Sequence, residues 1–227
     1  MAGNWDERPY HSLDFEVKGQ FGKKLYKLSL NGGMGCPNRD GTAGSGGCIF
    51  CSEGGSGDFA PDPSLSIAGQ LAAAKALVEK KLPKTGKAGY IAYFQAYTNT
   101  YAPAARLERL FSEAMADEEV EVLSIATRPD CLPEEVLELL GRLNCVKPVW
   151  VELGLQTIHE ETARFIRRGY ETSCFDRAAA ALRKAGIPVV AHVILGLPGE
   201  GKKELLETID HLNREEIWGV KLQLLHI

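Results

Sequence analysis

Six short apolar runs alternate with helix-like segments along the chain, and this alternation limits the possible folds more than any other feature. The runs read as β-strands, and the later ones are continuously apolar, as is typical of parallel strands buried on both faces. We expect strands at residues 24–30, 90–96, 120–126, 148–155, 187–195 and 220–225. Because parallel strands are joined by right-handed crossovers, the chain should wind into a doubly wound sheet or a barrel.

The segments between the strands have helical composition and recognisable ends. Ser66 can cap the first helix, and Gly186 is placed to stop the fifth. Helices are expected at residues 66–80, 103–115, 133–143, 159–167, 174–185 and 202–212. No polar linker divides the chain, so we predict a partial (β/α)6 TIM-like α/β barrel over residues 23–227, preceded by an N-terminal extension, residues 1–22. The sixth strand should be an exposed edge, which further sequence or a partner chain would cover.

Three cysteines occupy a glycine-rich loop after the first strand: Cys36, Cys48 and Cys51. Eleven residues separate the first two, and two residues separate the last two. Three thiolates can hold three irons of a [4Fe–4S] cluster, whose usual complement is four cysteines. The fourth iron is then open to a substrate or cofactor.

A structural zinc ion is the alternative for this loop. It would need a fourth ligand such as His11, Cys131 or Cys174, and no second Cys-x-x-Cys or His pair supplies one at a familiar spacing. The spacing therefore favours the iron–sulfur cluster. We expect Cys131, Cys145 and Cys174 to be plain thiols.

Composition bounds where the protein works. The first twenty residues are polar and mixed in charge, unlike a signal peptide, and no apolar stretch approaches the roughly 20 residues of a membrane span. We therefore expect a cytoplasmic protein with reduced thiols and no membrane partner. The net charge of −4 gives no overall attraction to nucleic acid. A local basic patch could still form from Lys23, Lys24, Lys27, Arg164, Arg167 and Arg168.

Polar residues recur where the expected strands end, and in a barrel these ends share one mouth. They are residues 95–101, the run Thr127-Arg128-Pro129-Asp130, Glu152 with Gln156, and residues 192–200. With the cysteine loop they resemble the radical S-adenosylmethionine (radical SAM) enzymes. The run Cys-Pro-Asn-Arg-Asp-Gly-Thr, followed by Gly-Gly-Cys-Ile-Phe-Cys, resembles the YtqA/YhcC-like branch, which is related to the elongator catalytic subunit. The usual loop has three residues between its first two cysteines, so this one departs from the common pattern.

The resemblance implies two cofactors, a [4Fe–4S] cluster and S-adenosylmethionine, and a set of residues that would hold the latter. Gln95, Thr98 and Asn99 would take the methionine amine, and Glu152 and Gln156 would face the ribose. Arg168 would pair with the carboxylate, although adjacent Arg167 could take that role. Gly196, Pro198 and Phe50 would bound the adenine.

Two residues of the expected mouth can also be read from their chemistry alone. Glu152 lies within an apolar strand, where an unpaired carboxylate is costly, so it should face a polar ligand. His192 is open between a satisfied core histidine and a substrate contact.

Three functions follow from these expectations. The first is a radical SAM enzyme that modifies a tRNA wobble uridine, with a reducing donor of flavodoxin or ferredoxin type and tRNA as partners. The second is a radical SAM enzyme that acts on a small metabolite or a protein. The third is a non-catalytic iron–sulfur or zinc binding module.

Overall fold

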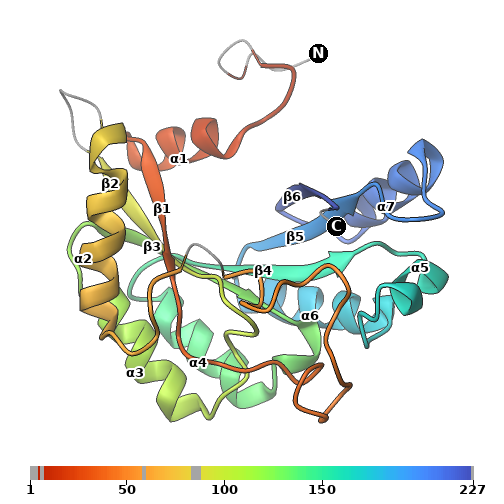
Figure 1. Cartoon of the computed structure of the whole chain (residues 1–227). Coiled ribbons are helices and arrows are strands. Elements are labelled where there is room, and N and C mark those ends of the chain that lie inside the picture. The colour runs from red at the N-terminus through yellow and green to blue at the C-terminus, as the bar shows by residue number, and fades with distance from the viewer. Residues whose placement is uncertain (1–4, 6–7, 58–59, 83–87, 226–227) are drawn as a thin grey trace.

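The strands form one parallel sheet whose spatial order follows the chain, β1-β2-β3-β4-β5-β6. The computed structural model describes residue 5 and residues 8–57, 60–82 and 88–225. The strands are β1 (Leu25–Leu30), β2 (Gly89–Phe94), β3 (Val120–Thr127), β4 (Val149–Gln156), β5 (Val189–Leu195) and β6 (Gly219–Leu224). The sheet curls into a half-barrel with β1 and β6 as its edges (Figure 1). A doubly wound sheet is excluded because its strand order would reverse, so the predicted partial barrel is confirmed.

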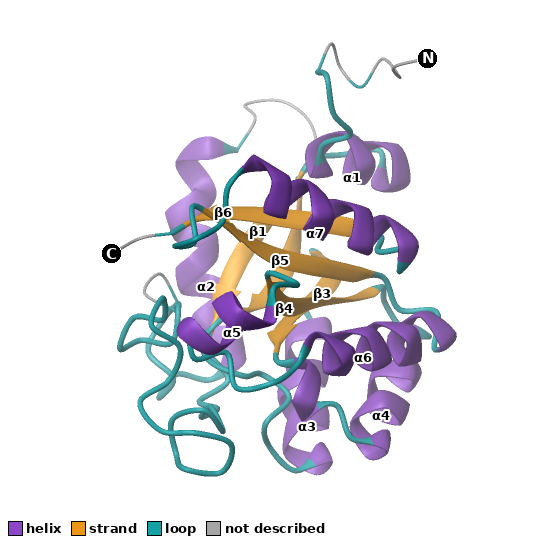
Figure 2. Ribbon diagram, turned by 90° about the vertical axis from the view of Figure 1, so that its right-hand side faces the viewer, coloured by secondary structure: helices purple, strands orange, loops and turns teal. Residues whose placement is uncertain are grey.

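Helices cover the outer face of the sheet, as Figure 2 shows. They are α2 (Ile67–Val78), α3 (Ala104–Met115), α4 (Glu134–Asn144), α5 (Glu160–Phe165), α6 (Thr172–Lys184) and α7 (Lys202–Arg214), with 3₁₀ turns η1 (Glu79–Lys81) and η2 (Pro129–Cys131). Ser66 caps α2 as expected, its hydroxyl accepting from the Gly69 N–H at 3.1 Å. Gly186 follows α6 with φ of +70°, the left-handed turn that favours glycine there.

The main core lies between the outer face of the sheet and these helices. Alternate residues of each strand point outward, so β2 contributes Ala92 and Phe94, and Phe94 packs edge-on against Phe111 of α3 with ring centroids 5.0 Å apart. The inward-facing residues are thereby left to line the interior of the half-barrel.

An additional helix, α1 (Leu13–Phe21), closes the N-terminal end of the strands. The residue pattern of the polar N-terminal extension had not suggested it. Ser12 caps this helix, and Val17 is buried against inward-facing residues of four strands. These residues are Leu25, Ile91, Val122 and Trp150. In Figures 1 and 2, α1 lies above the sheet, while the long loop that follows β1 lies below it. The interior is therefore plugged with apolar side chains at one end and open toward the loops at the other.

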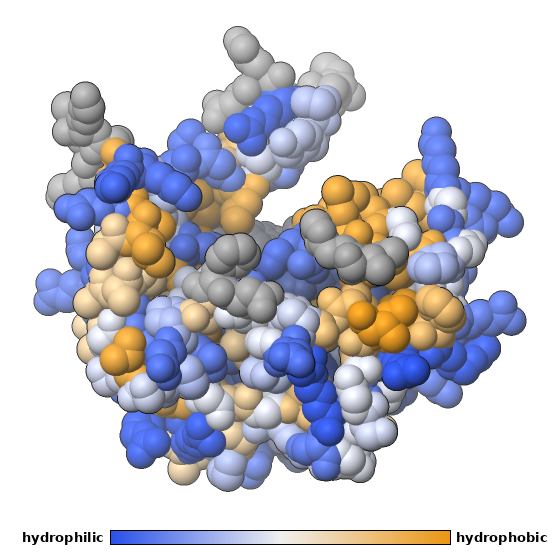
Figure 3. Space-filling view, in the orientation of Figure 1, coloured by the Kyte–Doolittle hydropathy of each residue, from blue (hydrophilic) through white to orange (hydrophobic). Residues whose placement is uncertain are grey.

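Strand β6 has no helix over its outer face within the described residues. Its alternate residues Val220, Leu222 and Leu224 are 41%, 56% and 67% exposed. Apolar side chains gather on the right-hand part of the molecule in Figure 3. β6 is also the last strand in the order of the sheet and pairs only with β5 among the described residues, so the predicted exposed edge is confirmed. None of the described helices combines the length and the apolar composition that a membrane span requires.

Candidate functional site

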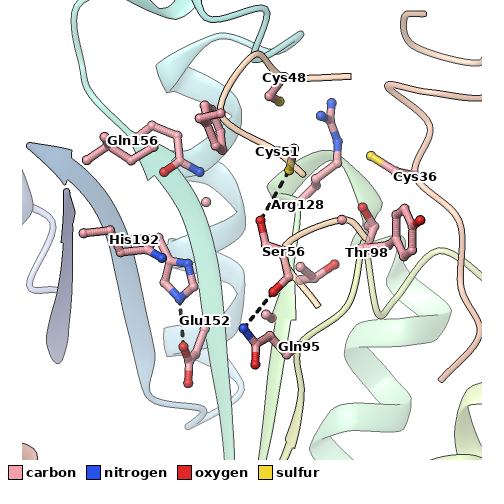
Figure 4. A pocket seen from close by; sticks show the side chains of 18 of the residues that line it. Cys36, Cys48, Cys51, Ser56, Gln95, Thr98, Arg128, Glu152, Gln156 and His192 are labelled. Atoms are coloured by element: carbon pink, nitrogen blue, oxygen red, sulfur yellow. Dashed lines mark hydrogen bonds and ion pairs between the residues drawn. The ribbon is translucent and has the colours of Figure 1, made fainter. Parts of the chain in front are cut away.

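A pocket of about 360 Å³ lies at the C-terminal ends of the strands, where the long loop folds over the half-barrel. Its walls come from the three cysteines, from the ends of β2, β3 and β4, and from β5 and β6 (Figure 4). Parallel barrels place functional groups at this end, because all strands deliver their following loops there.

The cysteine loop is fixed by the amide of Asn38. This side chain donates to the Arg167 carbonyl at 2.7 Å and to Sγ of Cys48 at 3.3 Å. Gly44 must lack a side chain, because a Cβ there would lie 2.3 Å from Oδ1 of Asn38. Ile49 adds a backbone hydrogen bond to the Ile166 carbonyl at 3.2 Å. The loop is thus attached to the segment after α5, and this attachment sets the position of Cys48.

The spread of the cysteines fits a cluster better than a single zinc ion. All three line the pocket, and all are free thiols. Sulfurs bound to one zinc lie roughly 3.8 Å apart, given Zn–S bonds of about 2.3 Å. Within the described part of the chain, the three sulfurs do not all lie within 4.8 Å of one another. A four-iron cube binds each cysteine at a separate iron, so it does not require three sulfurs around one metal ion.

None of the candidate fourth zinc ligands joins the cysteines. Cys131 and Cys174 do not line the pocket, and His11 stacks on Trp5 and pairs with Glu16 at 3.0 Å. Among the described residues, the donor set is therefore three thiols without a fourth protein ligand.

Burial, reinforced by neighbouring Cys51, raises the pKa of the Cys48 thiol to about 11. The metal-free thiol is therefore protonated at neutral pH, and a metal that binds there must displace this proton.

Five of the nine residues predicted to hold S-adenosylmethionine line the same pocket: Phe50, Gln95, Thr98, Glu152 and Gln156. Phe50 packs beside Ile166, Ile194 and Leu197 at one wall. Gln95 accepts from the Ser29 hydroxyl at 2.9 Å and donates to the Ser56 carbonyl at 2.7 Å, so its amide is held in one orientation.

Gln156 is the residue whose geometry points most directly to a ligand. It ends β4 at an irregularity in the pairing with β5, its φ is +69°, and it is 8% exposed. Its Oε1 is buried without a hydrogen-bond partner among the described residues. An orphaned buried acceptor costs free energy unless a ligand satisfies it.

Left-handed backbone is concentrated at this pocket. Within the described residues, five non-glycine residues have positive φ, and three of them line the pocket: Ser56, Tyr97 and Gln156. Such conformations cost free energy and persist mainly where function constrains the chain.

Besides Arg168, three predicted cofactor contacts do not line the pocket: Asn99, Gly196 and Pro198. The Asn99 side chain is completely buried, and its amide donates to the carbonyls of Phe94 and Ala126 at 3.1 and 2.9 Å. It therefore ties the loop after β2 to β3 and does not line the pocket, and its Oδ1 has no hydrogen-bond partner among the described residues. Gly196 lines a separate hollow between β5 and α7, and Pro198 is exposed beyond it. The glycine–proline turn follows β5 on the helix side of the sheet. At the pocket wall, where Gly196 and Pro198 were expected, the structure has Ile194 instead.

Arg168 is the clearest correction to the predicted cofactor contacts. Its side chain is completely buried and donates to the carbonyls of Leu155, Thr157 and Tyr170 at 2.8, 2.6 and 2.9 Å. These bonds hold the end of β4 against the loop before α6. The remaining Nη2 lies 3.5 Å from Oε2 of Glu160, and the side chain does not line the pocket. Arg167 has an exposed side chain and does not line the pocket either.

Arg128 is the arginine that does line the pocket. The run that contains it stands out in the sequence, but nothing there assigns a role to Arg128 itself. Its guanidinium forms a bidentate pair with the Asp130 carboxylate, with hydrogen bonds of 2.9 and 2.6 Å, and its Cζ lies 4.7 Å from the centroid of the Tyr170 ring. Burial opposes its charge, but the Asp130 carboxylate raises the pKa of Arg128 overall. It therefore contributes a permanent cation beside the cysteines.

A second set of residues, which sequence reasoning missed apart from Glu152 and His192, lies deeper in the half-barrel. We call it the polar layer; its members are Lys27, Tyr93, Ser124, Glu152, His192 and Lys221. Glu152 is at its centre: Oε1 accepts from Lys27 and from Ser124 at 2.7 Å, and Oε2 lies 2.7 Å from Nε2 of His192 and 3.5 Å from Nζ of Lys221. The sequence does contain a signal that could have identified them, because each of these polar residues occupies an inward-facing position within a strand.

Electrostatics keep this carboxylate ionised. Burial alone would raise the pKa of Glu152, but the bond from His192 and the charges of Lys27 and Lys221 hold it well below its usual range. Burial lowers the pKa of His192, against the opposing effect of Glu152, so the ring is neutral near pH 7 and donates from Nε2. The Glu152 oxygens are already occupied by these donors, which leaves little capacity for the predicted ribose contact.

Taken together, the pocket has the donors that its cofactors would need. Cys36, Cys48 and Cys51 would hold the cluster, while Gln95, Thr98 and Gln156 offer polar groups for S-adenosylmethionine. When bound, such a cluster supplies an electron that cleaves the sulfonium and yields a 5′-deoxyadenosyl radical. The protein's part is to orient the cofactor and to exclude water.

The comparisons with known proteins agree with this chemistry. The sequence model of the radical SAM superfamily matches residues 31–212. The chain is 45% identical over 221 residues to the uncharacterized protein YtqA of Bacillus subtilis, covering 97% of this chain and 68% of that protein. It is 42% identical over 209 residues to the protein YhcC of Escherichia coli, covering 92% and 65%. The chain thus spans about two thirds of the length of these relatives.

More distant similarities link the chain to the elongator proteins. A shorter match, 33% identical over 84 residues, covers 37% of this chain and 15% of a tRNA uridine(34) acetyltransferase of Methanocaldococcus jannaschii. Among solved structures, Elp3 of Methanocaldococcus infernus aligns with a TM-score of 0.62 and 17% identity, covering 89% of this chain and 46% of that one. At this identity the structural likeness shows a shared fold.

Proposed function

The chain belongs to the radical SAM superfamily, and from this premise we propose that it modifies a tRNA wobble uridine by radical chemistry. Cys36, Cys48 and Cys51 hold the [4Fe–4S] cluster, and S-adenosylmethionine occupies the mouth of the half-barrel against Gln95, Thr98 and Gln156. A donor of flavodoxin or ferredoxin type supplies the electron.

The observation that carries the proposal is the pocket itself. It joins a three-cysteine set to a polar interior that extends below the mouth, so a radical formed at the mouth faces the interior. The edges β1 and β6 are not paired with each other, which leaves the half-barrel open on one side. An open side suits a large substrate that inserts one group, and unstacked bases of RNA loops are such groups.

The choice of tRNA rests on the relative named for uridine 34 and on the charges beside the cysteine loop. Arg39 lines the pocket, and exposed Arg164 and Arg167 lie on the segment to which Asn38 attaches the loop. The basic patch is smaller than the sequence predicted, because Lys27 and Arg168 point inward and Lys23 pairs with Glu121. We therefore expect RNA binding to be salt-sensitive but modest.

The test is a 5′-deoxyadenosine assay on anaerobically reconstituted protein, run with and without tRNA from cells that lack the gene. We expect tRNA to stimulate deoxyadenosine formation, and the Cys48→Ala protein to form none. Nucleoside mass spectrometry of the same tRNA should show a wobble uridine that changes on incubation.

Two outcomes distinguish the tRNA part of the proposal from the radical-chemistry part. Deoxyadenosine formation that tRNA does not stimulate, together with unaltered wobble nucleosides in the deletion strain, would remove tRNA and leave radical chemistry standing. Absence of any S-adenosylmethionine cleavage by protein with four irons would remove the radical reaction as well.

A further inference from the structure

The polar layer forms a second recognition element inside the half-barrel, below the site expected for the cofactor. Along β4, Glu152 precedes Gln156 by four residues, or roughly 13 Å at the usual rise of a strand. Beneath the polar layer lies the apolar plug that α1 completes. Tyr93, Glu152, His192 and Lys221 therefore form the floor of the pocket, while Lys27 and Ser124 contact Glu152 without lining the pocket themselves.

The charges of this floor do not balance. Lys27 and Lys221 both point at the single carboxylate of Glu152, and His192 is neutral because burial lowers its pKa. Two ammonium groups opposite one carboxylate leave one positive charge in excess. Burial also lowers the pKa of Lys221, which Glu152 only partly offsets. The Lys27 and Lys221 side chains are 30% and 32% exposed, so a small anion can reach them from the pocket, and an anion bound there would neutralise the excess charge.

The floor also has a donor to spare. Lys221 has three N–H groups; one points to the Tyr93 hydroxyl at 3.1 Å and one toward Glu152 at 3.5 Å. No acceptor among the described residues takes the third. Both ammonium groups lie over the Tyr93 ring, Lys27 at 4.4 Å and Lys221 at 5.0 Å from its centroid. The ring therefore holds the two cations in place from strands at opposite edges of the sheet.

From these contacts we infer that the floor of the pocket binds a carboxylate group carried by the substrate, with Lys221 as the principal donor and Lys27 as the second cation. A monoanion matches the single excess charge, whereas a phosphate dianion would exceed it. This inference rests on the proposed function in one respect, that the pocket receives the substrate. It does not depend on the substrate being tRNA.

The test uses acetate and acetamide as probes, because they share a shape and differ in charge. Protein labelled with ¹⁵N-lysine and reconstituted with its cluster is titrated while the ammonium signals are followed by NMR. We expect acetate to shift the Lys221 signal saturably and acetamide to leave it unchanged. A charge-assisted hydrogen bond is worth about 1.5–3 kcal/mol, so Lys221→Met should weaken acetate binding, followed at Lys27, by roughly ten- to a hundredfold.

Two further variants make the result specific. Lys221→Arg should retain part of the response, and it serves if the methionine variant folds poorly. Lys203→Met is the matched control, since Lys203 is an exposed lysine on α7, with a side chain that is 80% exposed. It should bind acetate like the wild type.

Four outcomes of the titrations without S-adenosylmethionine would overturn the inference. They are an equal response to acetamide, an equal response to chloride, tighter binding of inorganic phosphate than of acetate, and acetate binding that survives in Lys221→Met. Loss of the acetate response on saturation with S-adenosylmethionine would assign the floor to the cofactor's own carboxylate, which also contradicts it. Because the titrations contain no RNA, each of these results can be interpreted even if the tRNA proposal fails.

Discussion

At the scale of single residues, three cysteine side chains decide whether the pocket can hold its cluster. We expect Cys36→Ala, Cys48→Ala and Cys51→Ala each to lose bound iron or retain a degraded cluster, because no other described thiol lines the pocket. Iron content after anaerobic reconstitution, with the visible absorbance, measures this directly. Cys145→Ala is the matched control, since Cys145 is exposed at the end of α4, and its iron content should equal that of the wild type. Iron retained in Cys48→Ala would refute the assignment.

Arg168 is a structural arginine, and its removal should cost stability. Arg168→Met leaves the carbonyls of Leu155 and Thr157 buried without their donor, at about 1–3 kcal/mol each. We expect the free energy of unfolding to fall by about 3 kcal/mol or more in urea titrations. Arg167→Met, with its exposed side chain, should change it by about 0.5 kcal/mol or less. Equal effects of the two substitutions would contradict this account.

His192 and Glu152 give stability a defined pH dependence. The pKa of each is lowered in the folded protein, so below the unfolded pKa of about 6.5 for histidine the unfolded chain binds protons that the folded chain refuses. The contribution of His192 is therefore complete above about pH 6.5 and is lost on acidification, by up to about 1.4 kcal/mol per pH unit, whereas that of Glu152 is lost only below the unfolded glutamate pKa of about 4.3. Urea denaturation of the metal-free protein from pH 7 to 5 measures the slope. In His192→Gln the slope over this range should shrink, and an unchanged slope would assign it to other groups.

At the scale of elements, α1 acts as a plug for the interior of the half-barrel. Its one completely covered contact is Val17, which is 1% exposed and packs on Leu25, Ile91, Val122 and Trp150. Val17→Ala should lower the free energy of unfolding by about 2 kcal/mol, through lost burial and the cavity that remains. Differential scanning calorimetry of both variants measures this, and Gln20→Ala, on the exposed side of the same helix, should leave the free energy of unfolding unchanged. A neutral Val17→Ala would mean that α1 is not part of the folded core.

The sequence predicted the elements far better than it predicted their contacts. Apolar runs gave all six strands, and capping residues such as Ser66 and Gly186 gave helix ends, because these signals are local. Helix α1 was missed because its sequence is mostly polar and only Val17 is completely buried.

The residues of the site divide in the same way. Cys36, Cys48 and Cys51 could be found from spacing alone, and Gln156 from its place at a strand end. The position of Arg168 could not be predicted, because its shortest hydrogen bonds are to backbone carbonyls, which leave no mark in a sequence. Lys27 and Lys221 were missed because they meet at Glu152 only when the sheet curls and brings distant strands around one interior.

At the scale of the whole molecule, the sheet should be unevenly stable. Strands β3 and β4 are buried between neighbours on both sides, whereas β6 is an edge with three apolar residues exposed. Amide hydrogen exchange should therefore be on the order of a hundredfold faster in β6 than in β3 and β4. Mass spectrometry of peptic fragments from each strand gives the comparison. Equal protection would mean that β6 unfolds only together with the whole barrel.

The left-handed backbone at Gln156 places stability and recognition in conflict. A glycine would adopt its φ of +69° without steric cost, so Gln156→Gly should relieve strain in the main chain. The same substitution would delete an amide at the pocket wall whose oxygen is buried without a hydrogen-bond partner among the described residues. Selection for heat resistance alone would favour the substitution, while selection for catalysis would oppose it. Attempts to engineer a more robust form of this protein should therefore leave the end of β4 untouched.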